Sequence, residues 1–175
     1  MPLSLSIPTL RTDRLVLRAP EAADFEPVAA FFADAERAKG FSGPFDRRNA
    51  WRWFAGMIGH WALRGYGFWI VDTAEGETVG MVGLWYPDGW LEPELGWVMF
   101  AAGEGRGFAY EAAIEVRRYA YEELGFKTLC SNIIPGNERS IALAERLGAF
   151  HERTYENVSH GTELVFRHPP AVAAA

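Results

Sequence analysis

Gly103-Glu104-Gly105-Arg106-Gly107-Phe108-Ala109 is the stretch around which the chain is organised, and it separates a predicted strand over 92–100 from the longest predicted helix, over 107–124. Apolar residues recur every three or four positions along that helix, at Ala109, Ala113, Val116, Ala120 and Leu124. Glycines allow consecutive main-chain N–H groups to turn toward one point, and a helix N-terminus adds partial positive charge. The stretch therefore suits a phosphate or pyrophosphate group.

The residues before this turn predict a strand, two helices and a three-stranded meander. Runs with a two-residue alternation predict the meander strands over 67–72, 78–86 and 92–100. Earlier in the chain we expect a strand over 10–18 and helices over 25–39 and 47–63. Asp24 and Asp46 are the expected N-caps of these two helices.

The residues after the turn complete an α/β fold. We expect a strand over 127–133, a helix over 137–147 and a final hairpin of strands over 150–158 and 162–168. A strand, a helix and a strand in succession indicate a right-handed parallel crossover. The prediction is one mixed, mostly antiparallel sheet of about seven strands with about four helices, in a single domain over 1–168. The tail over 169–175 is expected to be disordered.

Composition and charge argue against several classes of protein. The net charge of -6 and the lack of a Lys- or Arg-rich run argue against nucleic acid as a partner. Cys130 is the single cysteine, so an internal disulfide is excluded and a cytoplasmic location is expected. The first ten residues lack the basic start of a signal peptide, and no run approaches the ~20 apolar residues of a membrane span. We therefore expect neither export nor a membrane partner.

The glycines alone leave the ligand open. A P-loop requires a Lys followed by a hydroxyl residue, and this stretch has neither. A dinucleotide fingerprint requires Gly-x-Gly-x-x-Gly, and its third glycine falls on Phe108 or on Tyr110, depending on the register. A tight turn that binds nothing remains an alternative at this point.

Stretches outside the turn carry a more specific signal. Gly105-Arg106-Gly107-Phe108-Ala109-Tyr110-Glu111-Ala112 is followed by Asn137-Glu138-Arg139-Ser140 and by Glu145-Arg146-Leu147-Gly148-Ala149-Phe150. Together they resemble the coenzyme A signature of the GNAT superfamily of N-acetyltransferases. Leu10-Arg11-Thr12-Asp13-Arg14-Leu15-Val16-Leu17-Arg18, Gly80-Met81-Val82-Gly83-Leu84 and Pro93-Glu94-Leu95-Gly96-Trp97 are similar to the RimJ/RimL-like branch. That branch is named for enzymes that acetylate the N-terminal amine of ribosomal proteins.

The resemblance covers 10–168 and implies a site for acetyl-CoA. The pyrophosphate would lie on the main-chain amides of Glu104, Gly105, Arg106, Gly107, Phe108 and Ala109. The pantetheine arm would lie along the strand at Trp97, Val98 and Met99, in the manner of an added strand, and Asn137 would contact it. A carboxylate beside a pyrophosphate is unfavourable unless it points to solvent or pairs with Arg106, so we expect Glu104 to face outward.

Asn137 has a second, structural interpretation, and Ser140 is a candidate for the general acid. Asn is a preferred N-cap, so Asn137 can equally serve only to start its helix. Many superfamily members carry a Tyr four residues beyond the Ser140 position as the acid for the departing thiolate, and here that residue is Ala144. Ser140, directly or through water, is therefore the candidate acid. Cys130 is expected to be a buried hydrophobe rather than a nucleophile.

Glu94 is the candidate base, because an ammonium acceptor must lose a proton before it attacks and a desolvated carboxylate can titrate near neutral pH. The alternatives are a water chain, or an ordinary strand Glu that pairs with an Arg. Glu92 has the same predicted facing and could share this role or attract a cationic substrate. Phe41 and Trp90 lie in predicted loops and are expected to line the acceptor opening. No His spacing indicates a metal site.

Two functions follow from the resemblance. The first is an acetyl-CoA-dependent N-acetyltransferase that transfers acetyl directly to a primary amine, either a protein N-terminus or a small amine, in a ternary complex. The alternative is a non-catalytic acyl-CoA-binding or sensing module with the same fold. The edge strand of the C-terminal hairpin could also support a homodimer.

Overall fold

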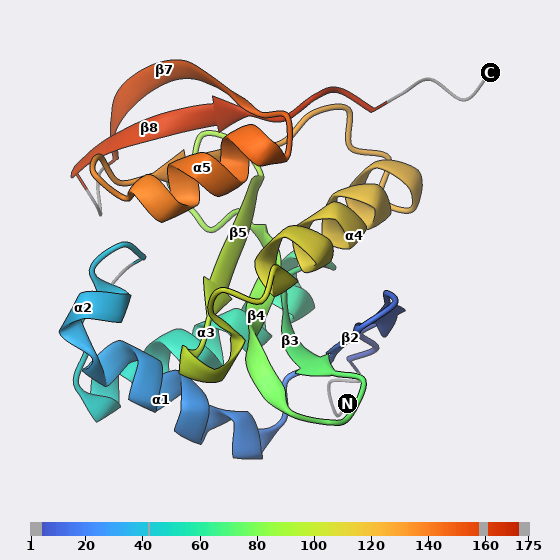
Figure 1. Ribbon diagram of the computed structural model, residues 1–175, viewed down its shortest axis with the longest axis vertical. Coiled ribbons are helices and arrows are strands. Elements are labelled where there is room, and N and C mark those ends of the chain that lie inside the picture. Colours follow the sequence, from blue (N-terminus) through green and yellow to red (C-terminus); the bar gives the residue numbers. More distant parts are fainter. Residues whose placement is uncertain (1–4, 42, 158–160, 172–175) are drawn as a thin grey trace.

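The computed structural model describes residues 5–41, 43–157 and 161–171 and has one mixed sheet of eight strands, in the order β1-β2-β3-β4-β5-β6-β8-β7 (Figure 1). The strands are β1 (Leu10–Arg11), β2 (Leu15–Arg18), β3 (Phe68–Thr73), β4 (Thr78–Trp85), β5 (Glu94–Met99), β6 (Cys130–Ile133), β7 (Phe150–Asn157) and β8 (Gly161–Arg167). Neighbours are antiparallel except β5 and β6, which run parallel and pair at Glu94 and Cys130. The predicted α/β class and the parallel crossover are confirmed.

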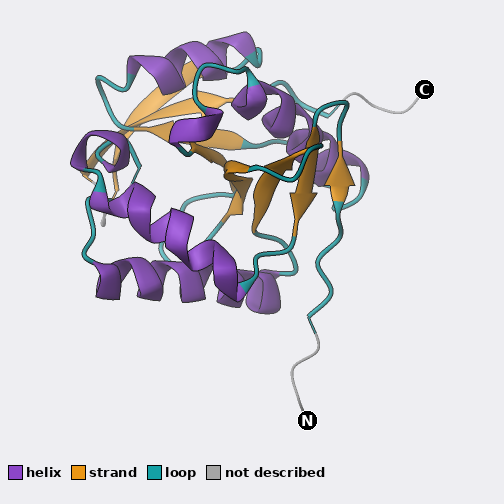
Figure 2. Ribbon diagram, turned by 60° about the horizontal axis from the view of Figure 1, so that its bottom comes forward, coloured by secondary structure: helices purple, strands orange, loops and turns teal. Residues whose placement is uncertain are grey.

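Helices cover both faces of the sheet (Figure 2). They are α1 (Phe25–Ala33), α2 (Ala35–Ala38), α3 (Arg47–Arg64), α4 (Phe108–Glu122) and α5 (Glu138–Arg146). Side chains of α1 and α3 pack with Phe68, Met81 and Val98 on one face. Side chains of α4 pack with Val82 and Leu95 on the other. Two apolar layers therefore enclose β3, β4 and β5, which makes this part of the sheet a rigid support for the residues at its edge. No helix in the described ranges has the length and apolar character needed to cross a bilayer.

Two predicted elements are each divided in the structure, which raises the counts above the predicted seven strands and four helices. The segment over 10–18 is a hairpin, because the hydroxyl of Thr12 accepts from the Leu15 N–H and starts a turn between β1 and β2. The helix over 25–39 breaks at Asp34, which is extended and caps α2 through the N–H groups of Glu36 and Arg37. Asp46 caps α3 as predicted, with a 2.8 Å bond from the Asn49 N–H.

Pro169 and Ala171, which follow the last strand, contact the rest of the domain. The hydroxyl of Tyr121 donates to the main-chain oxygen of Pro169 at 2.7 Å, and the Ala171 N–H contacts the Lys127 oxygen at 3.4 Å. The disordered tail over 169–175 stays a prediction, and 172–175 lie outside the described residues. Val158, predicted as the end of a strand, also lies outside them.

Candidate active site

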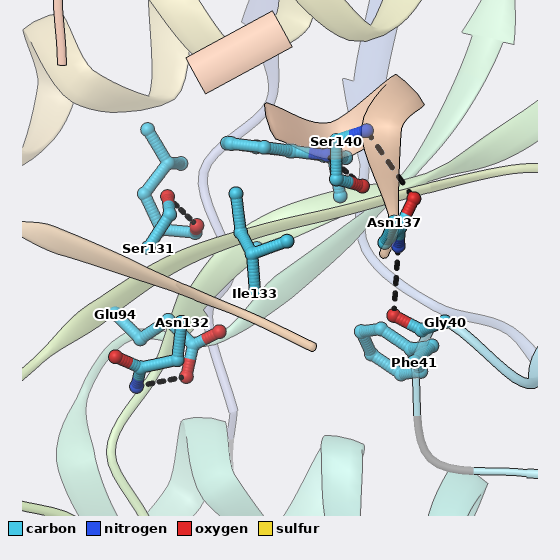
Figure 3. A pocket seen from close by; sticks show the side chains of 11 residues that line it. Gly40, Phe41, Glu94, Ser131, Asn132, Ile133, Asn137 and Ser140 are labelled. Atoms are coloured by element: carbon cyan, nitrogen blue, oxygen red, sulfur yellow. Dashed lines mark hydrogen bonds between the residues drawn. The ribbon is translucent and has the colours of Figure 1, made fainter. Parts of the chain in front are cut away.

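A pocket lies between β5 and β6, just beyond the point where Glu94 and Cys130 pair (Figure 3). It is lined by four consecutive residues of β5, 94–97, and by three of β6, 131–133. The predicted site residues Phe41, Glu94, Trp97, Asn137 and Ser140 all lie on its walls. Residues assigned separately from the sequence to the base, the acid, the coenzyme arm and the acceptor opening thus share one pocket.

Glu94 is half-buried at this pocket, and two neutral donors hold its carboxylate. Trp90 Nε1 donates to Glu94 Oε2 at 2.9 Å. Asn132 Nδ2 donates to the same oxygen at 3.0 Å (Figure 3). Desolvation raises the pKa of Glu94 to about 7, with a further upward contribution from the charge of Glu163, and the two donors lower it in part. A carboxyl in this environment can exchange a proton near neutral pH.

Ser140 and Asn137 form the opposite wall, on the first turn of α5. Trp97 Nε1 donates to Ser140 Oγ at 3.3 Å, which leaves the serine O–H available as a donor. Asn137 Oδ1 accepts from the Ser140 N–H, so Asn137 is the N-cap of α5. Asn137 Nδ2 also donates to the main-chain oxygen of Gly40 at 3.2 Å. A Cβ on Gly40 would lie 2.4 Å from Asn137 Nδ2, so a larger residue there would displace the Asn137 side chain.

The main chain of β5 presents alternate residues to the pocket side. The Phe100 N–H donates to Val79 on the β4 side at 2.9 Å. In an antiparallel ladder successive residues point their N–H and C=O groups to opposite sides. Trp97 and Met99 therefore direct these groups toward the β6 side, and Val98, opposite Met81, directs them toward β4. This corrects the expectation that all three residues offer main-chain bonds to a pantetheine arm.

The glycine-rich turn has the backbone shape that its sequence predicts. Gly105 and Gly107 have φ values of 71° and 77°, and Gly107 is the N-cap of α4. A Cβ on Gly103 would lie 2.4 Å from the main-chain oxygen of Val79, so close packing against β4 explains the first glycine. The turn therefore exposes the N-terminus of a 15-residue helix, where main-chain N–H groups suit an anion.

Glu104 forms ion pairs with two arginines outside the turn. Its carboxylate lies 3.3 Å from Arg37 Nε on α2 and 3.4 Å from Arg139 Nη1 on α5. Arg106 instead pairs with Glu77 at 2.9 Å and stacks on the Phe108 ring. Glu104, expected to face outward, is therefore partly buried between two arginines and does not pair with Arg106. Glu104 balances two guanidinium groups beside the turn, and these groups could equally meet a phosphate.

Glu92 and Cys130 are both removed from the chemistry of the pocket. Glu92 is paired with Arg153 at 2.9 Å and with Arg167, which lowers the pKa of its carboxyl and compensates its charge. The expectation that Glu92 shares the base role or attracts a cation is therefore wrong. Cys130 is buried, and burial raises the pKa of its thiol, which leaves no thiolate to act as a nucleophile.

The structure adds residues that the sequence did not single out. Asn132 donates a hydrogen bond to Glu94, and Ser131 contacts the main chain of β5. The sequence did not single them out because the register of a parallel strand pair cannot be read from periodicity. Trp90, expected at the acceptor opening, donates a hydrogen bond to Glu94. Phe41 packs in an aromatic cluster with Phe32 and Trp53 as well as on the pocket. Within residues 5–41, 43–157 and 161–171, no group of three or more His, Cys, Asp or Glu side chains could hold a metal ion.

Comparison with known proteins agrees with this geometry. Residues 14–149 match the acetyltransferase (GNAT) domain. The crystal structure of the acetyltransferase from Agrobacterium tumefaciens str. C58 is similar at 38% identity, with a TM-score of 0.87 and coverage of 97% of this chain and 98% of that one. YkkB of Bacillus subtilis (strain 168), an uncharacterized protein, is 32% identical over 155 residues, which are 83% of this chain and 87% of the relative.

A more distant structure shares the fold alone. RimL, a ribosomal L7/L12 alpha-N-protein acetyltransferase in complex with coenzyme A, is 15% identical with a TM-score of 0.71, covering 90% of this chain and 94% of that one. The match of the family domain to most of the chain, together with the glycine turn and the β5–β6 pocket, decides the assignment. The chain belongs to the acetyltransferase (GNAT) family and is an acetyltransferase enzyme.

Proposed function

We propose that the protein is an N-acetyltransferase that transfers an acetyl group directly from acetyl-CoA to a primary amine held beside Glu94. The observation that carries the proposal is the half-buried Glu94 carboxyl, with a pKa of about 7, at a pocket that also holds Ser140. In its ionised form Glu94 accepts the proton of an ammonium acceptor and leaves a neutral amine that can attack. A non-catalytic coenzyme-binding module has no need of such a carboxyl.

The chain offers groups suited to the pyrophosphate, the pantetheine arm and the thioester sulfur of acetyl-CoA. The glycine turn and the α4 N-terminus suit the pyrophosphate. The main-chain groups of Trp97 and Met99 suit the pantetheine amides. The coenzyme supplies the activated acetyl group, and the Ser140 O–H, which faces the same pocket, provides a proton for the departing sulfur. Each of these assignments follows from placement, and each stays a prediction until coenzyme binding is measured.

The acceptor is a peptide N-terminus, as in the RimJ/RimL-like branch, or a small amine. Two observations favour a primary amine over a hydroxyl acceptor. Glu94 has a raised pKa of about 7, which makes it a stronger base toward an ammonium proton than an ordinary carboxylate, and the pocket wall at Phe41 is apolar and helps to desolvate the attacking group.

Calorimetry with acetyl-CoA, followed by thiol release in the same preparation over a panel of small amines and short peptides, tests the proposal. We expect binding and release with at least one primary amine. Binding with no release across the panel would contradict direct acetyl transfer to these acceptor classes, and absence of binding would contradict the coenzyme site.

A further inference from the structure

Ser131 connects β6 to the main chain of β5 at the pocket (Figure 3). Its hydroxyl lies 2.6 Å from the main-chain oxygen of Leu95 and 2.9 Å from His168 Nε2. Main-chain pairing of the two strands occurs one residue earlier, at Glu94 and Cys130. At Leu95 the strands are therefore joined by a side chain, at the point where the pocket separates them.

The direction of every proton in this connection follows from Arg117 on α4. Arg117 Nη1 lies 3.2 Å from His168 Nδ1, and a guanidinium can only donate. His168 Nδ1 must therefore accept, so its proton is on Nε2 and is donated to Ser131 Oγ. The serine O–H is then directed at Leu95, whose carbonyl can only accept.

His168 is suited to this fixed arrangement because it stays neutral. It is 1% exposed, and burial together with the charges of Arg117 and Arg167 lowers its pKa to about 3. Arg117 Nη1 also donates to the Leu147 oxygen at the end of α5 at 2.7 Å. One buried chain of hydrogen bonds thus joins α4, α5, the residue after β8, β6 and β5.

We propose that Arg117, His168 and Ser131 form a positioning network that sets the separation of β5 and β6 at the pocket, with Ser131 as the residue that holds β5. The inference rests on the proposed function, because the strand held at Leu95 is the one whose Trp97 main chain would receive the coenzyme arm. If the Leu95 carbonyl loses its donor, a buried acceptor is left unsatisfied. The strands then shift, or water enters, and the Trp97 main chain moves with them.

The central test is Ser131→Ala, assayed by calorimetry with coenzyme A and by steady-state kinetics. Loss of this buried hydrogen bond should weaken coenzyme binding about tenfold and lower kcat/KM for acetyl-CoA by a similar factor. Cys130→Ala is the matched control, since it removes one buried atom on the same strand without touching Leu95, and it should change both values by less than about twofold.

The isosteric pair Ser131→Thr and Ser131→Val separates the hydroxyl from the shape of the side chain. Thr should bind coenzyme A more tightly than Val, because only Thr keeps the donor to Leu95. Equal coenzyme A binding by the Thr and Val variants would overturn the network. So would a Ser131→Ala variant that binds coenzyme A as tightly as a wild-type protein that does bind it. Failure of the wild type to bind coenzyme A would instead contradict the proposed function.

Nitrogen-15 NMR of the imidazole tests the network in the unaltered protein, whatever the variants do. We expect His168 to be neutral between pH 5 and 8, with its proton on Nε2 and an acceptor-type Nδ1. A proton on Nδ1, or titration within this range, would contradict the donor chain from Arg117 to Leu95.

Discussion

The glycine turn and the β5–β6 pocket use different parts of the chain. The turn is contiguous, and its shape depends on main-chain geometry at Gly103, Gly105 and Gly107. The pocket is assembled from side chains of distant segments, among them Glu94 and Ser140. A substitution in the turn should therefore act through backbone shape and local charge, whereas one in the pocket should act through the loss of a particular functional group.

Gly107→Asp should have the largest effect, because it places a side chain at a φ of 77° and a negative charge where the coenzyme phosphates are expected. Strain and repulsion together should weaken acetyl-CoA binding at least about 100-fold. Gly107→Asn is the matched control, since Asn tolerates this conformation and carries no charge. Calorimetry that finds equal acetyl-CoA affinity for Gly107→Asp and wild type would contradict the assignment of the turn to the coenzyme phosphates.

Glu94→Gln should lower kcat about 100-fold, because Gln cannot accept the ammonium proton, while the coenzyme Kd stays within about twofold. Glu92→Gln is the control, since Glu92 is paired with Arg153 and Arg167 outside the pocket. The thiol-release rate of this control should stay within about threefold of wild type. Equal rates for Glu94→Gln and wild type would remove Glu94 from the base role.

Glu104→Gln should have a smaller effect, and it should strengthen coenzyme binding rather than weaken it. The change removes the carboxylate between Arg37 and Arg139 beside the turn, although Arg37 keeps its pair with Asp34. Coenzyme binding should therefore tighten about fivefold at low salt and less at high salt. Glu77→Gln is the control, because it also removes one negative charge, in this case the carboxylate that pairs with Arg106. Equal tightening in both variants would assign the effect to net charge and not to the two arginines.

Trp90→Phe should have the smallest effect. It removes the indole donor to Glu94 Oε2, and this hydrogen bond lowers the pKa of the carboxyl. The midpoint of the pH–rate profile should therefore move upward, by less than about one unit. A downward shift would show that the indole does not stabilise the carboxylate.

Local signals predicted much of this fold and part of the site. The period of three to four in α4, the Asp46 cap of α3 and the glycines of the turn each involve neighbours in sequence. Glu94 was identified because it lies on the strand that leads into the turn. Such features depend on short-range backbone preferences, so one sequence is enough to find them.

Features that depend on distant contacts were missed. The break between β1 and β2 is stabilised from α4, where Glu111 accepts from Thr12 Oγ1 at 2.5 Å and from Arg14 Nε at 2.7 Å. The partners of Glu104 come from α2 and α5, and Asn132 reaches Glu94 only through the parallel pairing of β5 and β6. None of these pairings has a periodicity that could reveal it.

The pH dependence of kcat/KM for the amine acceptor, measured for wild type and Glu94→Gln, tests most directly the claim that Glu94 is the base. An alkylamine acceptor is the right substrate, since its own pKa near 10 separates its titration from that of the enzyme. Because protonated Glu94 cannot accept a proton, wild-type activity should fall as the pH drops below about 7, and this inflection should vanish in the variant. An inflection near 7 that persists in Glu94→Gln would contradict the account.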